Sequence, residues 1–124
     1  MKTKEINVLA LAYLGDAIYE KYIRLYLVKS GISKVNDLQK RSVNYVSARA
    51  QSHFLTLLIN NNMFDEEEMS IIMRARNHKG KSKPKNTDII TYKHATALEA
   101  LIGYLYLEKR IDKLDQIMKF IIGE

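Results

Sequence analysis

The sequence has 124 residues, which suits one domain with its own hydrophobic core and is too short for two. Apolar residues make up 47% of the chain and charged residues 27%, a globular composition that excludes a disordered polymer. The absence of cysteine excludes disulfides, thiolate metal sites and cysteine nucleophiles, and it fits the reducing cytoplasm, where we expect the protein. No apolar run is long enough for a signal peptide or a membrane span, so we expect a single domain over residues 1–124 with no membrane contact.

Helical spacing of apolar residues predicts a helix over residues 6–29, which Gly31 ends by taking a left-handed conformation. Ser33 is expected to cap a short helix that ends near Gln39. A further helix is predicted over residues 42–60, with one apolar stripe along its length. The first half of the chain therefore reads as three helices.

The second half of the chain begins with an acidic run whose residues Asp65 and Glu68 have the spacing of a capping box. Acidic residues in a first helical turn also suit the helix dipole, so we interpret this run as a helix start and not as a metal site. The remaining expected elements are a loop over 78–86, a helix that Thr87 or Asp88 caps and that continues to about Leu107, and a last helix over 112–122. An all-α fold follows.

The positive charge of the chain is concentrated in one segment. Residues 74–85 contain six basic side chains and no acidic one, which equals the net charge of +6 of the whole chain. Such a segment favours contact with a polyanion, because neutralised phosphates release their condensed counterions. The ordinary alternative is a solvated loop that lysines keep soluble.

Two carboxylates, Asp16 and Glu99, stand alone among apolar and small residues in the middle of two predicted helices. Each helix also carries a glycine nearby, Gly15 or Gly103, although a mid-helix glycine costs about 1 kcal/mol relative to alanine. Small residues allow another backbone to approach closely. We infer that the two helices cross at their small residues and bring Asp16 and Glu99 together.

Two neighbouring carboxylates repel each other, and burial penalises their charges further. The repulsion is relieved when one acid is protonated, when a basic side chain pairs with them, or when a divalent cation such as Mg²⁺ binds both. Glu20 and Thr96 lie one turn away and can face the same region. The alternative is that the acids cap helices or pair with an arginine such as Arg24 or Arg49, and the residues alone leave both interpretations open. A metal ion held by the two acids, together with the basic segment, suggests phosphodiester hydrolysis.

The segment ALAYLGDAIYE, residues 10–20, resembles the signature helix of ribonuclease III nuclease domains, and ALEALIGYLYL, residues 97–107, resembles their second metal-binding helix. The match extends to the Mini-ribonuclease III subfamily, which has the nuclease domain alone, through the segments RARN, PKNTD and NDLQKRS. The resemblance covers nearly the whole chain. It implies a ribonuclease III-like helical endonuclease domain, with no room for an appended RNA-binding domain.

The resemblance further implies a homodimer that cuts double-stranded RNA with Mg²⁺, or with Mn²⁺, and leaves 5′-phosphate and 3′-hydroxyl ends. The expected substrate is the double-stranded stalk of the 23S ribosomal RNA precursor. Asp16 and Glu99 match the metal-binding acids of the family, whereas Ala12 and Thr96 stand where the full-length enzymes carry two further acids. Contact with an RNA duplex goes by shape, phosphates and 2′-hydroxyls. The residues expected to make it are Arg74, Arg76, Asn77, Lys79, Lys81 and Lys85.

Three other interpretations are considered. A non-catalytic helical RNA-binding module would bind RNA without metal-dependent cleavage. A DNA-binding regulator would use residues 33–52 as a helix-turn-helix, with Lys40, Arg41 and Arg49 facing the DNA. An interaction bundle with no nucleic acid leaves the basic segment unexplained. The three histidines are scattered and form no metal-binding motif.

Overall fold

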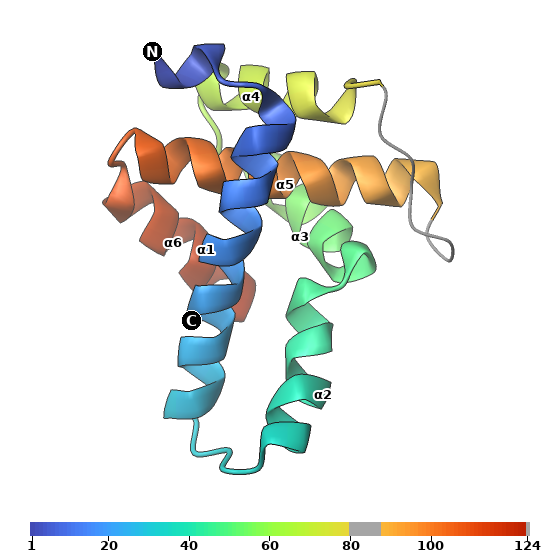
Figure 1. The fold of residues 1–124 in the computed structure, drawn as a ribbon, viewed down its shortest axis with the longest axis vertical. Coiled ribbons are helices and arrows are strands. Elements are labelled where there is room, and N and C mark those ends of the chain that lie inside the picture. The colour runs from blue at the N-terminus through green and yellow to red at the C-terminus, as the bar shows by residue number, and fades with distance from the viewer. Residues whose placement is uncertain (80–87, 124) are drawn as a thin grey trace.

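The structure is a computed structural model that describes residues 1–79 and 88–123. In these ranges it consists of one 3-10 turn and six α-helices without a strand, which confirms the predicted all-α class. Figure 1 shows how the helices are arranged. The elements are η1 (Thr3–Glu5), α1 (Val8–Lys29), α2 (Val35–Val46), α3 (Ala48–Asn60), α4 (Glu66–Arg76), α5 (Ile89–Leu107) and α6 (Ile111–Ile122). None of these helices is long and apolar enough to cross a membrane.

Helix α5 is the centre of the fold. It packs against α1, α3, α4 and α6, and in Figure 1 it runs across the middle of the molecule behind α1. Between Ala95 and Leu105 every residue is buried except Glu99, which is half-buried. A helix that neighbours surround on all sides is apolar around its whole circumference. A carboxylate in the middle of such a helix therefore marks a position with a purpose other than packing.

The predicted boundaries hold for α1, α5 and α6 to within two residues, but the prediction for α2 and α3 is wrong. We expected Ser33 as a cap and a break near residues 40–42, whereas α2 runs unbroken from Val35 to Val46, and its N-cap is Lys34. The break lies at Ser47, whose extended backbone ends α2 and whose hydroxyl accepts a hydrogen bond from the Ala50 amide at 3.1 Å. A serine at this position caps the new helix and so defines its start.

The short connection also decides against the DNA-binding interpretation. Ser47 alone joins α2 to α3. A helix-turn-helix uses a turn of roughly three to four residues. The positions of Lys40, Arg41 and Arg49 therefore do not fit that motif.

The N-terminal end of α4 confirms the predicted capping box. The Glu68 amide donates to Asp65 Oδ1 at 2.8 Å, and the Asp65 amide donates to Glu68 Oε1 at 2.8 Å. Glu68 is fully buried, and its Oε2 lies 2.8 Å from Arg110 Nη1. Lys113 of α6 is 3.7 Å from Glu68 Oε1. The acidic run is thus a structural anchor between α4 and α6.

Candidate active site

Helices α1 and α5 cross backbone against backbone at two glycines. A Cβ atom at Gly15 would lie 1.7 Å from the carbonyl oxygen of Glu99, and a Cβ atom at Gly103 would lie 2.1 Å from the carbonyl oxygen of Leu11. Neither position has room for a methyl group, so the crossing requires glycine in both helices. This confirms the prediction that the two helices cross at their small residues.

The crossing brings together two regions that are 83 positions apart in the sequence. Asp16 directly follows Gly15, whose backbone faces the Glu99 carbonyl, so the two acid-bearing residues lie on adjacent stretches of backbone. Asp16 is exposed and Glu99 is half-buried, which corrects our expectation that both acids are buried. In the part of the chain that the structure describes, the Asp16 side chain makes no hydrogen bond or ion pair.

Two nearby polar side chains have other partners. Glu20 pairs with Arg24 across one helical turn, with 3.2 Å between Oε2 and Nη2. The Thr96 hydroxyl donates to the Tyr92 carbonyl at 3.0 Å, one turn back in the same helix. Arg24 is therefore engaged with Glu20 and does not neutralise Asp16. The alternative in which Arg24 pairs with this acid does not hold in the described ranges.

Tyr19 is a neighbour of Glu99 that is absent from the predicted site residues. Its ring is fully buried, and its hydroxyl donates to the Tyr45 carbonyl at 2.6 Å. Burial raises the pKa of the Tyr19 phenol above its usual value, and the charge of Glu99 adds to this effect. The phenol therefore stays a neutral donor next to the acid. Its position three residues after Asp16 is the one signal that could have pointed to it.

The carboxylates of the site meet the requirements of one kind of metal ion only. Within residues 1–79 and 88–123, no three His, Cys, Asp or Glu side chains form a group that could hold one. A pair of carboxylates fits Mg²⁺, which keeps several waters and takes one or two carboxylates together with substrate phosphates. The exposure of Asp16 leaves room for water and phosphate. The donor set thus suits a hydrated Mg²⁺ and not a metal enclosed by the protein.

The basic residues at the end of α4 have different environments. Arg74 donates from Nη1 to the Lys4 carbonyl at 2.8 Å and from Nη2 to the Ile6 carbonyl at 3.4 Å, so it fastens the N-terminal segment. Arg76 is half-buried, while Asn77, the C-cap of α4, and Lys79 are exposed. The other two predicted RNA-binding residues, Lys81 and Lys85, lie outside the described residues.

A hollow of about 310 Å³ adjoins Arg76, and two of its lining residues are basic residues that are absent from the predicted RNA-binding set. Its lining residues are Arg76, Asn77, Ile90, Lys93 and His94. Lys93 and His94 belong to α5, outside the basic segment. Because the hollow forms only when α4 meets α5, no local sequence pattern could have indicated these two residues.

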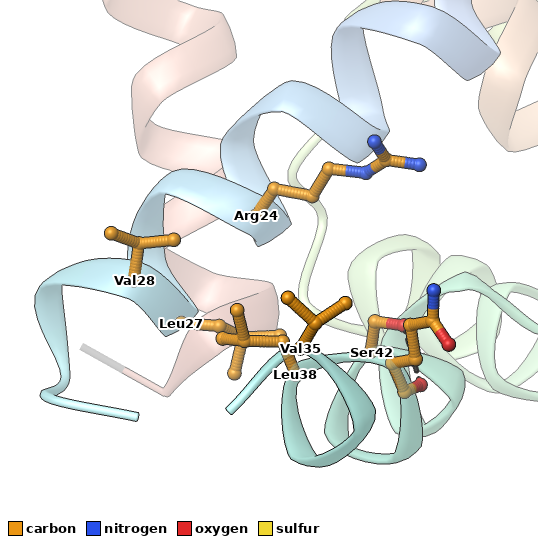
Figure 2. A pocket seen from close by; sticks show the side chains of 7 residues that line it. Arg24, Leu27, Val28, Val35, Leu38 and Ser42 are labelled. Carbon is orange, nitrogen blue, oxygen red and sulfur yellow. Dashed lines mark hydrogen bonds between the residues drawn. The ribbon is translucent and has the colours of Figure 1, made fainter. Parts of the chain in front are cut away.

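A second hollow, of about 220 Å³, lies between the end of α1 and α2. Figure 2 shows it lined mainly by apolar side chains, with Leu27 and Val28 from α1 facing Val35 and Leu38 from α2. Arg24 and Ser42 lie at its edges in the same view. None of the predicted site residues lines this groove.

Comparison with known proteins defines the class. The ribonuclease III domain family matches residues 9–110, a range that contains both Asp16 and Glu99. The chain belongs to the ribonuclease III family, whose members are endoribonucleases specific for double strands. The predicted fold and enzyme class are thereby confirmed.

Individual relatives narrow the comparison. A Mini-ribonuclease 3 from Staphylococcus aureus is 46% identical over 119 residues, which cover 96% of this chain and 89% of the relative. A Mini-ribonuclease 3 from Enterococcus faecalis is 44% identical over 119 residues, with 96% and 90% covered. The crystal structure of a protein from Fusobacterium nucleatum has a TM-score of 0.86 and 38% identity, and the match covers 96% of this chain and 93% of that one. These relatives confirm the resemblance to the Mini-ribonuclease III subfamily.

Proposed function

We propose that the protein is a Mg²⁺-dependent endoribonuclease of the cytoplasm that cleaves double-stranded RNA and trims the paired stalk of 23S ribosomal RNA precursors. The observation that carries this proposal is the α1–α5 crossing, where the Gly15 and Glu99 backbones meet and two acid-bearing residues become neighbours. The resemblance to the Mini-ribonuclease III subfamily supports the choice of substrate.

Asp16 and Glu99 are the residues that would hold the metal ion. When bound, Mg²⁺ lowers the pKa of a water nucleophile and stabilises the negative charge that develops on the phosphate. The glycine crossing fixes the backbone that carries Glu99, and the buried Tyr19 phenol stays neutral and adds no negative charge of its own beside this acid. Asp16 is open to solvent and can meet an incoming phosphodiester from the outside. No further side chain is needed as a base.

We also propose that the protein acts as a homodimer built on the outer face of α1. Tyr13 is 85% exposed, and the small residues Ala10 and Ala17 of the same helix are exposed as well. An exposed aromatic ring between small residues suits a twofold interface, and a twofold axis suits the two antiparallel strands of a duplex. In sedimentation measurements, Tyr13→Asp should yield monomers, while Tyr106→Asp, at another exposed tyrosine, should stay dimeric. A wild-type monomer would contradict this assignment.

Cleavage of a long RNA duplex tests the enzymatic proposal. Wild-type protein should cut the duplex with Mg²⁺ and not with EDTA. Asp16→Asn and Glu99→Gln should each lose at least about 100-fold in rate, because several kcal/mol of transition-state stabilisation depend on the metal. Asp37→Asn removes an exposed carboxylate from α2 and should keep the wild-type rate.

RNA binding measured in parallel separates this proposal from the non-catalytic module. Duplex that stays intact with wild-type protein and Mg²⁺, despite measurable binding, would establish the module instead. Full activity of both acid variants would move the reaction to other residues. Accumulation of 23S precursor ends in cells that lack the protein checks the substrate.

A further inference from the structure

The hollow between the end of α4 and the first turns of α5 is built from side chains with restricted freedom. Arg76, Lys93 and His94 line it, and all three are half-buried. Packing already limits their rotamers, so a ligand that they bind pays less ordering entropy than one bound by fully exposed lysines. Ile90 supplies an apolar wall, and Asn77 adds an amide at the rim.

The charge in this hollow is not balanced by the described acids. Neither Arg76 nor Lys93 makes an ion pair or a side-chain hydrogen bond with the other residues that the structure describes. The acid that influences His94 is Asp88, which is exposed and serves as the N-cap of α5. Its two oxygens accept from the Thr91 amide at 2.9 Å and the Thr91 hydroxyl at 2.7 Å. Two half-buried cations therefore share one hollow, and no acid among residues 1–79 and 88–123 forms an ion pair with either of them.

His94 completes the wall from the α5 side and is oriented by α3. The Ser52 hydroxyl lies 3.4 Å from His94 Nδ1. Partial burial lowers the pKa of the His94 imidazole, and the nearby positive charge of Arg76 lowers it further. The imidazole experiences the same positive field that an anion in the hollow would relieve.

We propose that Arg76, Lys93 and His94 bind one backbone phosphate of the RNA duplex and thereby position it for cleavage. This inference rests on the proposed function and names a contact for the same substrate. His94 precedes Glu99 by five residues, which is about 7.5 Å along the helix axis. A phosphate held here lies near the acids along the axis of α5 and about 140° around it, so the contact restricts how the duplex can lie across the acids.

Single neutral phosphates locate the contact. A set of synthetic RNA duplexes carries one methylphosphonate each, at successive positions around the cut, and binding is measured without metal. For wild-type protein, one position should weaken binding by roughly ten- to a hundredfold, the size of one hydrogen bond to a charged group. Lys93→Ala should weaken binding of the unmodified duplex to a similar extent. At the sensitive position, this variant should show no further loss, because the two changes remove the same interaction.

Matched variants and kinetics keep the test specific. Lys119→Ala removes an exposed lysine from α6 and should leave the position dependence of the wild type unchanged. His94→Ala should reproduce the effect of Lys93→Ala, and both variants should raise KM while kcat changes little. Equal thermal unfolding of the variants excludes misfolding. Losses that are additive at every methylphosphonate position would overturn the proposal.

Inorganic phosphate distinguishes the two sources of the anion. A His94 resonance that shifts on phosphate titration, together with additive losses on the modified duplexes, would mean that the hollow takes free phosphate and not RNA, which overturns the proposal. A wild-type protein that binds the duplex and never cleaves it would refute the proposed nuclease. Because binding is measured without metal, the methylphosphonate measurements would still decide whether the phosphate contact exists.

Discussion

Helix α5 meets its neighbours in two opposite ways. In its middle, the backbone of α1 touches it directly, and the contact depends on the absence of side chains at Gly15 and Gly103. At its N-terminal end, long basic side chains from α4 and α5 surround an open hollow. The space available at the two glycines decides the first contact, and the positive charge of the lining side chains decides what the hollow can bind. One helix therefore gives a rigid support to Glu99 and a surface that a charged ligand can still fill.

The largest expected effect on stability comes from Gly15→Ala, which breaks the crossing. The added methyl would stand 1.7 Å from the Glu99 carbonyl oxygen, so α1 and α5 must separate. We expect a loss of at least about 4 kcal/mol in the free energy of unfolding, or no folded protein. Gly31→Ala is the matched control, since its Cβ meets nothing within 4 Å. Strain from its positive φ should cost only about 1–2 kcal/mol. Equal denaturant midpoints for the two variants would contradict this account.

An intermediate effect is expected at the other end of α4, where charges are fully used for structure. Glu68→Gln leaves Arg110 and Lys113 without the buried carboxylate that they share. Because Arg110 and Lys113 are partly exposed and stay hydrated, the loss should be about 1.5–3 kcal/mol, the size of a hydrogen bond to a charged group. Glu66→Gln, at an exposed residue of the same turn, should change the free energy of unfolding by less than about 0.5 kcal/mol. A Glu68→Gln protein as stable as this control would show that the buried acid is dispensable.

The smallest effects on stability separate Arg74 from Arg76. Arg74→Ala removes two hydrogen bonds to the N-terminal segment and should cost about 1 kcal/mol. Arg76→Ala should cost less than about 0.5 kcal/mol. It should weaken RNA binding. The slope of the logarithm of the binding constant against the logarithm of the salt concentration should become shallower by nearly one unit. If Arg76→Ala destabilises the fold as much as Arg74→Ala and leaves the salt dependence unchanged, the contrast between the two arginines fails.

Features that depend on local chemistry could be predicted from the sequence. The capping box of Asp65 and Glu68 is visible in four consecutive residues. The crossing at Gly15 and Gly103 could be inferred because a glycine inside an apolar helix is unfavourable unless another backbone needs the space. The pairing of Asp16 with Glu99 as metal ligands stays a prediction until metal binding is measured.

The features that escaped prediction depend on contacts between distant parts of the chain. The sequence indicates a nucleic-acid contact at Arg74. Its hydrogen bonds to two backbone carbonyls cannot be foreseen, because these carbonyls are about 70 positions earlier in the sequence. Lys93 and His94 belong to the periodic pattern of α5. They line a hollow only because the end of α4 packs beside them. The joint at Ser47 was missed because apolar residues continue at helical spacing on both sides of it.

The glycine crossing also determines how the molecule tolerates change. Carbonyl and Cα atoms have the same dimensions in every protein, so where two main chains touch, the gap between the helices owes nothing to the shape of surrounding side chains. Substitutions in the remainder of the interior can shift their own neighbourhoods and still leave the backbones that carry Asp16 and Glu99 at a constant separation. The spacing of these two backbones is in this sense inherited from the peptide unit itself.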